Sequence, residues 1–250
     1  LRLATLVGAA LVGTSLLAAC GGGAGAATKD VTIAKAVDTI GFTTVEVAQD
    51  KGYFAQRGVS VTEQQLGGSS TAFAALQSGS VQFVTASSTA LLGAKAKGVP
   101  LQAVASLDYG VSLQLIASTN WIRTHHLAPQ QPLNTVMKGL TGATLGVIST
   151  TDLAYNRYLA KAAGIDPDQF KIITLKTQAA ALAALQHGQI DAFLLSPPNS
   201  FLAQAQGDAQ IIATLHSVPL LRKMAYDVLV VDAGYARANP ELVRSVATAM

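Results

Sequence analysis

The pattern of apolar and polar positions divides the first half of the chain into alternating strands and helices. Short β-branched runs alternate with segments in which apolar residues recur every three or four positions. The runs predict strands at residues 31–35, 59–65, 81–84, 101–107 and 111–118. The periodic segments predict helices at residues 43–51, 70–78 and 87–96, each followed closely by a glycine that can end it. This order favours a parallel sheet with helices on its faces.

The same rhythm restarts after a stretch that contains proline and glutamine at residues 129–132. Strand-like runs follow at residues 144–147, 170–174, 192–195 and 211–215, with helical segments at 151–163, 177–187 and 199–206. A last amphipathic helix at 241–250 has Asn239 as its N-cap and Pro240 in its first turn. We therefore expect two α/β sheets joined by an extended connector.

An internal repeat relates the two halves. Residues 66–98 align without gaps to residues 175–207 with 11 identities in 33 positions. Five identities are alanine pairs, but the alignment also pairs a Leu-Gln dipeptide and the glycine two residues after it. In both copies a helix, a strand and a second helix follow one another. The repeat therefore predicts two related lobes.

Composition and charge narrow the class of protein. The 250 residues are 50% hydrophobic and 12% charged, with a formal net charge of +3, which excludes a disordered chain. Lysine and arginine form no cluster that would follow a phosphate backbone, so we expect no nucleic-acid partner. With a single cysteine, no internal disulfide is possible and a cysteine-based metal site is not expected.

The N-terminal segment reads as an export signal. Arg2 precedes an apolar run over residues 3–19, and Leu17-Ala18-Ala19-Cys20 matches the bacterial lipobox. In such proteins the Cys20 sulfur receives a diacylglyceryl group and becomes the mature N-terminus. The glycine- and alanine-rich residues that follow form a flexible tether. We expect a protein that is exported and lipid-anchored at the outer face of a bacterial membrane.

These features predict five segments along the chain. Residues 1–19 form the lipoprotein signal peptide, 20–29 the tether, 30–118 the first part of lobe 1, 119–222 lobe 2 with the connector, and 223–250 the return to lobe 1. The sequence begins with Leu1 and its last helix has no C-cap, so we expect a fragment in which part of one lobe is missing.

Ligands of open α/β sheets bind beyond the carboxyl ends of the strands, where helices begin. The loops at these places are rich in glycine, serine and threonine, whose backbone N–H groups and hydroxyls suit a polar or anionic group. Ordinary helix capping explains any one of these residues equally well. The candidate ligand-binding residues are Thr39, Phe42, Gly68, Ser69, Ser70, Ser87, Ser88, Asp108, Tyr109, Ser149, Thr150, Thr151, Tyr155 and Ser196.

Motifs for catalysis are absent from the sequence. It contains no nucleophile elbow, no zinc-protease helix, no P-loop and no dinucleotide fingerprint. We therefore expect no catalytic residue, no metal, no cofactor and no enzymatic activity.

Five motifs, taken in order, carry a family resemblance. The segment Ala48-Gln49-Asp50-Lys51-Gly52-Tyr53-Phe54, continuing through residues 58–61, resembles a signature of extracytoplasmic solute-binding proteins for nitrate, taurine, alkanesulfonates and thiamine-precursor pyrimidines. Gly67-Gly68-Ser69-Ser70 and residues 75–83, 140–147 and 185–193 add further matches. The likeness covers residues 31–250.

The resemblance implies a bilobal type II periplasmic-binding fold that closes on a small-molecule ligand and delivers it to an ABC transporter permease, as a monomer. The predicted loops contain Lys176 as their one cation, and Asp108 and Asp152 lie near them. A small anion such as a sulfonate or nitrate and a pyrimidine-type heterocycle stacked on Tyr109 or Tyr155 both stay open. The alternatives in function are a pyrimidine synthase or dehydratase of the same fold and a ligand-sensing subunit of a membrane receptor.

Overall fold

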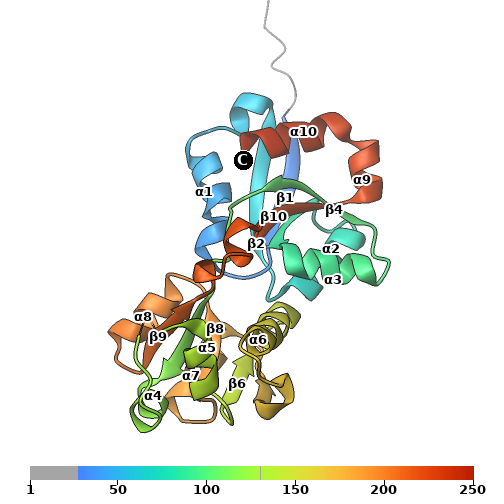
Figure 1. The fold of residues 1–250 in the computed structure, drawn as a ribbon. Coiled ribbons are helices and arrows are strands. Elements are labelled where there is room, and N and C mark those ends of the chain that lie inside the picture. Colours follow the sequence, from blue (N-terminus) through green and yellow to red (C-terminus); the bar gives the residue numbers. More distant parts are fainter. Residues whose placement is uncertain (1–27, 130) are drawn as a thin grey trace, which may run out of the picture.

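The computed structural model describes residues 28–129 and 131–250, which form two α/β lobes, one above the other in Figure 1. The expected signal peptide, Cys20 and most of the tether lie outside the described residues. None of the described helices is long and apolar enough to span a bilayer.

The first lobe contains a five-stranded sheet in the order β2-β1-β3-β10-β4. Its strands are β1 (Lys29–Lys35), β2 (Val59–Gln65), β3 (Phe83–Ser87), β4 (Leu101–Ser106) and β10 (Asp227–Asp232). One face packs on α1 (Thr43–Asp50) and α10 (Pro240–Ala249), beside α9 (Ala233–Ala238). The other face packs on α2 (Ser69–Gln77) and α3 (Ser88–Ala96). Side chains of β1 alternate between the two faces, Ile33 joining the first core and Ala34 the second, as the period of a strand requires.

The second lobe repeats this plan with the sheet order β7-β6-β8-β5-β9. Its strands are β5 (Gln114–Ser118), β6 (Thr144–Val147), β7 (Lys171–Thr174), β8 (Ala192–Leu195) and β9 (Ala209–Thr214). On one face lie α4 (Thr119–Thr124), α5 (Leu133–Gly139) and α6 (Thr150–Ala162). On the other lie α7 (Gln178–Gln186) and α8 (Asn199–Ala205). The repeated sequence segments correspond to α2-β3-α3 in one lobe and α7-β8-α8 in the other.

Two crossing segments join the lobes, one between β4 and β5 and one between β9 and β10. The second contains the 3-10 helices Leu215–Ser217 and Leu221–Lys223. The other described 3-10 helices are Ile40–Phe42, Ala55–Arg57 and Pro167–Gln169. Each lobe therefore receives one strand that belongs, in chain order, to the other half.

This exchange corrects two expectations from the sequence. The strand expected in lobe 1 at residues 111–118 is β5, which pairs with β8 and β9 in the second sheet, so the chain leaves lobe 1 before residue 114. Pro129 and Pro132, in the proline-containing stretch, lie between α4 and α5 of lobe 2 and do not connect the lobes. The sheets are also mixed, because β10 runs antiparallel to β3 and β5 antiparallel to β8. A run of hydrophobic residues predicts a strand but does not show whether that strand pairs in the parallel or the antiparallel direction.

Candidate functional site

A cavity of about 470 Å³ lies between the two lobes, within the usual size range of small-molecule sites. The first lobe lines it with the loop after β1, the start of α2, the end of β3 and the start of β10. The second lobe contributes the starts of α6, α7 and α8, the end of β8 and Leu113. Most of these segments are strand ends and helix beginnings, as the sheet rule predicted.

Eight of the fourteen candidate residues line this cavity. They are Thr39, Phe42, Gly68, Ser69, Ser87, Ser149, Thr151 and Ser196. The other six, Ser70, Ser88, Asp108, Tyr109, Thr150 and Tyr155, lie outside the lining. The structure thus brings candidate residues of both lobes to one cavity but excludes several of their sequence neighbours.

The structure does not place the two expected stacking residues, Tyr109 and Tyr155, in the wall of the cavity. Tyr109 is 75% exposed and faces solvent, so it cannot stack on a ligand in the cavity. Tyr155 is buried beside the cavity, where its ring makes an edge contact with Tyr226 at 6.1 Å between centroids. The aromatic residues of the lining are Phe42, which is also part of the core of lobe 1, and Tyr226, in the second crossing segment.

Direct hydrogen bonds join the lobes beside the cavity. Ser87 Oγ lies 3.0 Å from Thr151 Oγ1, and this pair is buried. Next to it, Thr89 Oγ1 lies 3.1 Å from Tyr155 Oη. The structure therefore shows the lobes in contact through the beginnings of α3 and α6. We call the Ser87–Thr151 and Thr89–Tyr155 pairs the interlobe latch.

Three helices that begin at the cavity are capped by side chains of their own segment. Ser87 caps α3 and Thr177 caps α7. Asp152 and Ser149 form a capping box at α6, in which Asp152 Oδ2 accepts hydrogen bonds from the N–H groups of Ile148 at 2.9 Å and Ser149 at 3.0 Å. Burial raises the pKa of Asp152 to about 6, against the lowering effect of these hydrogen bonds. At α2, by contrast, Gly68 occupies the N-cap and no side chain caps the helix.

A buried pair of carboxyl groups forms part of the first-lobe wall. Asp227, at the start of β10, lines the cavity and is only 2% exposed. Behind it, Asp108 Oδ1 accepts a hydrogen bond from the backbone N–H of Asp227 at 2.8 Å. Burial, and then the negative charge of Asp108, raises the pKa of Asp227 to about 8. Burial likewise raises the pKa of Asp108.

Asp227 was missed by the sequence reasoning. Because β10 is antiparallel to β3, its first residue lies opposite Ser87, the last residue of β3. A rule that searches only the carboxyl ends of strands therefore passes over it. The available signal was an aspartate that directly precedes the apolar run Val228–Val231.

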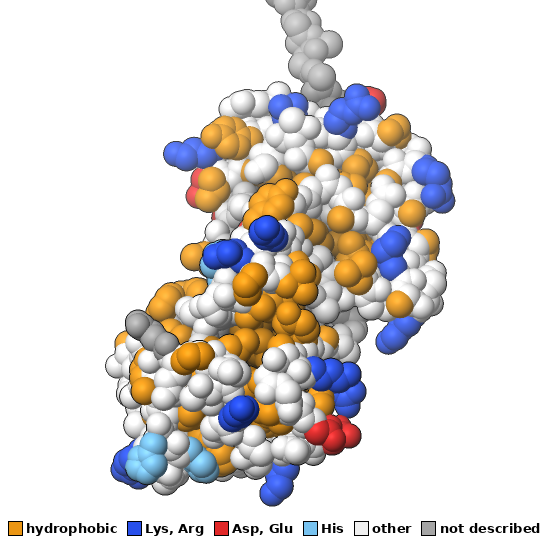
Figure 2. Space-filling view, in the orientation of Figure 1, with side chains coloured by type: hydrophobic (Ala, Val, Ile, Leu, Met, Phe, Trp, Pro, Cys, Tyr) orange, Lys and Arg blue, Asp and Glu red, His pale blue; other side chains and the backbone are white. Residues whose placement is uncertain are grey.

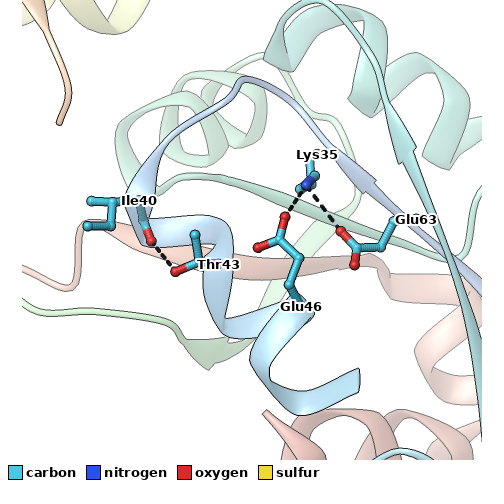
Figure 3. Close-up of polar contacts among 5 residues, drawn as sticks. All are labelled: Lys35, Ile40, Thr43, Glu46 and Glu63. Atoms are coloured by element: carbon cyan, nitrogen blue, oxygen red, sulfur yellow. Dashed lines mark hydrogen bonds and ion pairs between the residues drawn. The ribbon is translucent and has the colours of Figure 1, made fainter. Parts of the chain in front are cut away.

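Cations are scarce at the cavity. Lys35, at the end of β1, forms ion pairs with Glu46 and with Glu63, the latter at 3.2 Å, and does not line the cavity (Figure 3). The hydrogen bond that Lys35 Nζ donates to Glu46 is the main reason why the pKa of Lys35 is raised. The lining contains Lys176, which is exposed. On the face drawn in Figure 2, lysine and arginine side chains are scattered and form no continuous basic surface. Among the residues that the structure describes, no cluster of three or more metal-ligating side chains occurs.

Two related lobes, two crossing segments and a cavity between the lobes define the type II periplasmic solute-binding fold, confirming the expected fold class. The chain belongs to the NMT1/THI5-like family, whose model matches residues 39–250. No curated protein sequence gives a significant match.

Solved structures of the same fold include nitrate and sulfonate receptors. A protein from Bordetella bronchiseptica RB50 is 25% identical, with a TM-score of 0.71 over 89% of this chain and 70% of its own. The periplasmic nitrate-binding protein NrtA from Synechocystis PCC 6803 is 16% identical, with a TM-score of 0.74 over 89% of this chain and 60% of its own. The alkanesulfonate-binding protein SsuA from Xanthomonas axonopodis pv. citri, bound to MOPS, is 18% identical, with a TM-score of 0.69 over 90% and 72%. The chain thus spans 60% to 72% of these proteins.

Proposed function

We propose that this protein is the extracytoplasmic substrate-binding component of an ABC importer, anchored to the membrane through a lipid on Cys20. It captures a small organic solute between its lobes, either an anion of the sulfonate or nitrate kind or a pyrimidine-type heterocycle, and presents it to the permease. It acts as a monomer and performs no chemistry on the solute.

The observation that carries this proposal is the cavity itself. It lies between two lobes that touch through the interlobe latch, and both lobes contribute polar groups to its wall. A ligand held there contacts both lobes at once, so binding favours the closed arrangement over an open one. Family membership and the nitrate- and sulfonate-binding structures of the same fold support a transport receptor.

Capture without conversion can be tested with the purified protein. Isothermal titration against nitrate, taurine, alkanesulfonates and aminopyrimidines should give saturable binding of one class. Mass spectrometry of the recovered ligand should find it unchanged. Small-angle scattering should show a more compact protein when the ligand is bound. A converted ligand would reject the proposal in favour of an enzyme of the same fold.

Two hydroxyl residues at the starts of helices in different lobes provide a matched pair of variants for this assay. Ser69→Ala removes a hydroxyl from the cavity wall at the start of α2, and Thr150→Ala removes one that lies outside the lining. We expect Ser69→Ala to weaken binding by about 1 to 3 kcal/mol, the usual cost of losing a buried hydrogen bond. Thr150→Ala should leave affinity within twofold. Equal effects of the two variants would contradict the assignment of the cavity.

A further inference from the structure

We propose that Asp227, supported by Asp108, is the recognition group of the cavity and that it selects solutes that carry a protonated amine or an amidine. The inference rests on the proposed function, since it concerns the same cavity. It deepens that function by favouring a nitrogen-bearing solute over a nitrate- or sulfonate-like anion.

One carboxyl oxygen of Asp227 has no donor among the described residues once the group has lost its proton. While Asp227 is protonated, its side chain hydrogen-bonds to Asp108. Its Oδ2 is buried and no described group donates a hydrogen bond to it, although the residue lines the cavity. A buried carboxyl oxygen without a donor is costly, and an N–H group of a ligand would supply that donor. In the same wall, the hydroxyl of Thr39 is also buried and without a partner among the described residues. The cavity wall thus contains two buried polar groups that a solute could pair with.

The Asp108–Asp227 pair lies against the backbone of Gly41. Asp227 Oδ2 occupies the space that a side chain on Gly41 would need, and Asp108 Oδ2 approaches the same point to 3.0 Å. The two carboxyl groups are therefore packed over the Gly41 backbone and fixed before any ligand arrives. A preformed, buried acceptor binds a cation more strongly than one that must be ordered and desolvated first.

Acidic side chains outnumber basic ones in the cavity wall. The cavity lining contains Asp38, Asp152 and Asp227 against the single Lys176. Lys176 is exposed to water, whereas Asp227 is buried, where a charge acts through a lower effective dielectric constant. With a pKa of about 8 for Asp227, the Asp108–Asp227 pair holds about one negative charge near neutral pH. An anionic ligand beside Asp227 would meet repulsion, and a cation would neutralise the pair.

Helix N-termini usually bind anions, but most of those at this cavity are already capped. The starts of α3, α6 and α7 already hold the hydroxyls of Ser87 and Thr177 and the carboxylate of Asp152. The starts of α2 and α8, which also line the cavity, have no side-chain cap, and the start of the longer helix α2 remains available for an acceptor elsewhere on the solute.

The test compares three kinds of probe in titrations of the purified protein. The cationic probes are benzamidine, agmatine and putrescine; the neutral probes are benzamide and butyramide; the anionic probes are nitrate, benzenesulfonate and butanesulfonate. We expect binding from the cationic set. Asp227→Asn should weaken it at least tenfold, while Asp50→Asn, which removes one exposed negative charge from α1, should change it less than twofold.

A pH series provides a readout that a merely structural residue would not alter. The groups whose charges act on or near Asp227 are Asp108, Asp152, Tyr155 and Tyr226, all acidic groups. Benzamidine should therefore bind more tightly as the pH rises from 6 to 9 and Asp227 loses its proton. In Asp227→Asn this rise should disappear.

The outcomes separate the two proposals. Binding of an anionic probe that is unaffected by Asp227→Asn would retain the receptor and overturn amine recognition. Conversion of a bound amine would keep the recognition role and overturn the receptor. Failure of every probe to bind would count against both, and a cationic probe that binds equally to Asp227→Asn would overturn the inference alone.

Discussion

Replacing Asp227 with asparagine should make the protein more stable at neutral and alkaline pH. In the folded state the pKa of Asp227 is raised from 3.8 to about 8 by burial and by Asp108. The folded protein therefore holds a proton that the unfolded chain releases above pH 4. Stability is fully present below that pH and falls as the pH rises toward 8. Asparagine has nearly the same shape, stays neutral and can donate its amide N–H to Asp108.

The size of the effect follows from the pKa difference. Each pH unit in this range costs about 1.4 kcal/mol of unfolding free energy for one proton. Asp152, whose pKa is about 6, adds a similar dependence between pH 4 and 6. Between pH 6 and 8, above the pKa of Asp152, the proton on Asp227 accounts for an expected loss of up to about 3 kcal/mol. For a chain of this size that corresponds to a decrease in Tm of roughly 6 to 12 °C.

Urea denaturation at half-unit steps from pH 4 to pH 9 measures this dependence directly. The wild-type protein should lose stability between pH 6 and 8, and Asp227→Asn should lose much less. Asp50→Asn serves as the control for a change in net charge and should follow the wild type. An Asp227→Asn protein that is less stable than wild type at pH 8, or that keeps the full slope, would refute the strained carboxyl pair.

Two further predictions concern the latch and the anchor. Thr151→Val removes the hydroxyl that lies 3.0 Å from Ser87 Oγ in the other lobe but keeps the side-chain shape. The variant should weaken ligand binding by about 1 kcal/mol, or roughly fivefold, because this hydrogen bond exists only when the lobes touch. Titration calorimetry measures this, with the exposed Thr150→Val as control, and equal affinities in all three proteins would contradict the latch. Cys20→Ala should move the protein from the membrane fraction to the soluble fraction, because Cys20 is the one cysteine of the sequence to which the lipid could attach. An unchanged distribution after detergent-free extraction would contradict the lipobox interpretation.

The sequence carried enough information to predict the lobes, most elements and about a third of the residues that line the cavity. Hydrophobic periodicity and the repeat identified α2-β3-α3 and α7-β8-α8, because each element buries one face against its sheet. The helix beginnings at Ser69 and Ser149 were predicted to meet at the ligand because helices in such sheets start on the same side. The local sequence pattern was therefore sufficient to predict which loops face the ligand.

Strand exchange between the lobes could not be predicted in the same way. Whether β5 pairs within the first or the second sheet depends on contacts with β8 and β9, which lie about 75 to 100 residues later in the chain. Exposure was equally hard to predict, since Tyr109 and Tyr155 are the same residue type near the same cleft, yet one is 75% exposed and the other 4%. Both questions are settled by packing at long range and not by the residues nearby.

The exchange of strands also explains why Asp227 was not among the residues predicted from the sequence. An antiparallel strand brings its first residue, not its last, to the edge where the parallel strands end, so Asp227 of β10 reaches the cavity beside Ser87. A neutral or apolar residue there would stabilise the first lobe, because it would relieve the repulsion with Asp108. A carboxyl group whose burial costs stability, and whose oxygen finds no donor in the described protein, is best matched by a donor that arrives from outside. The same variant therefore links stability to binding. Asp227→Asn should have a higher free energy of unfolding than the wild type at pH 8, and it should no longer distinguish a cationic from a neutral probe.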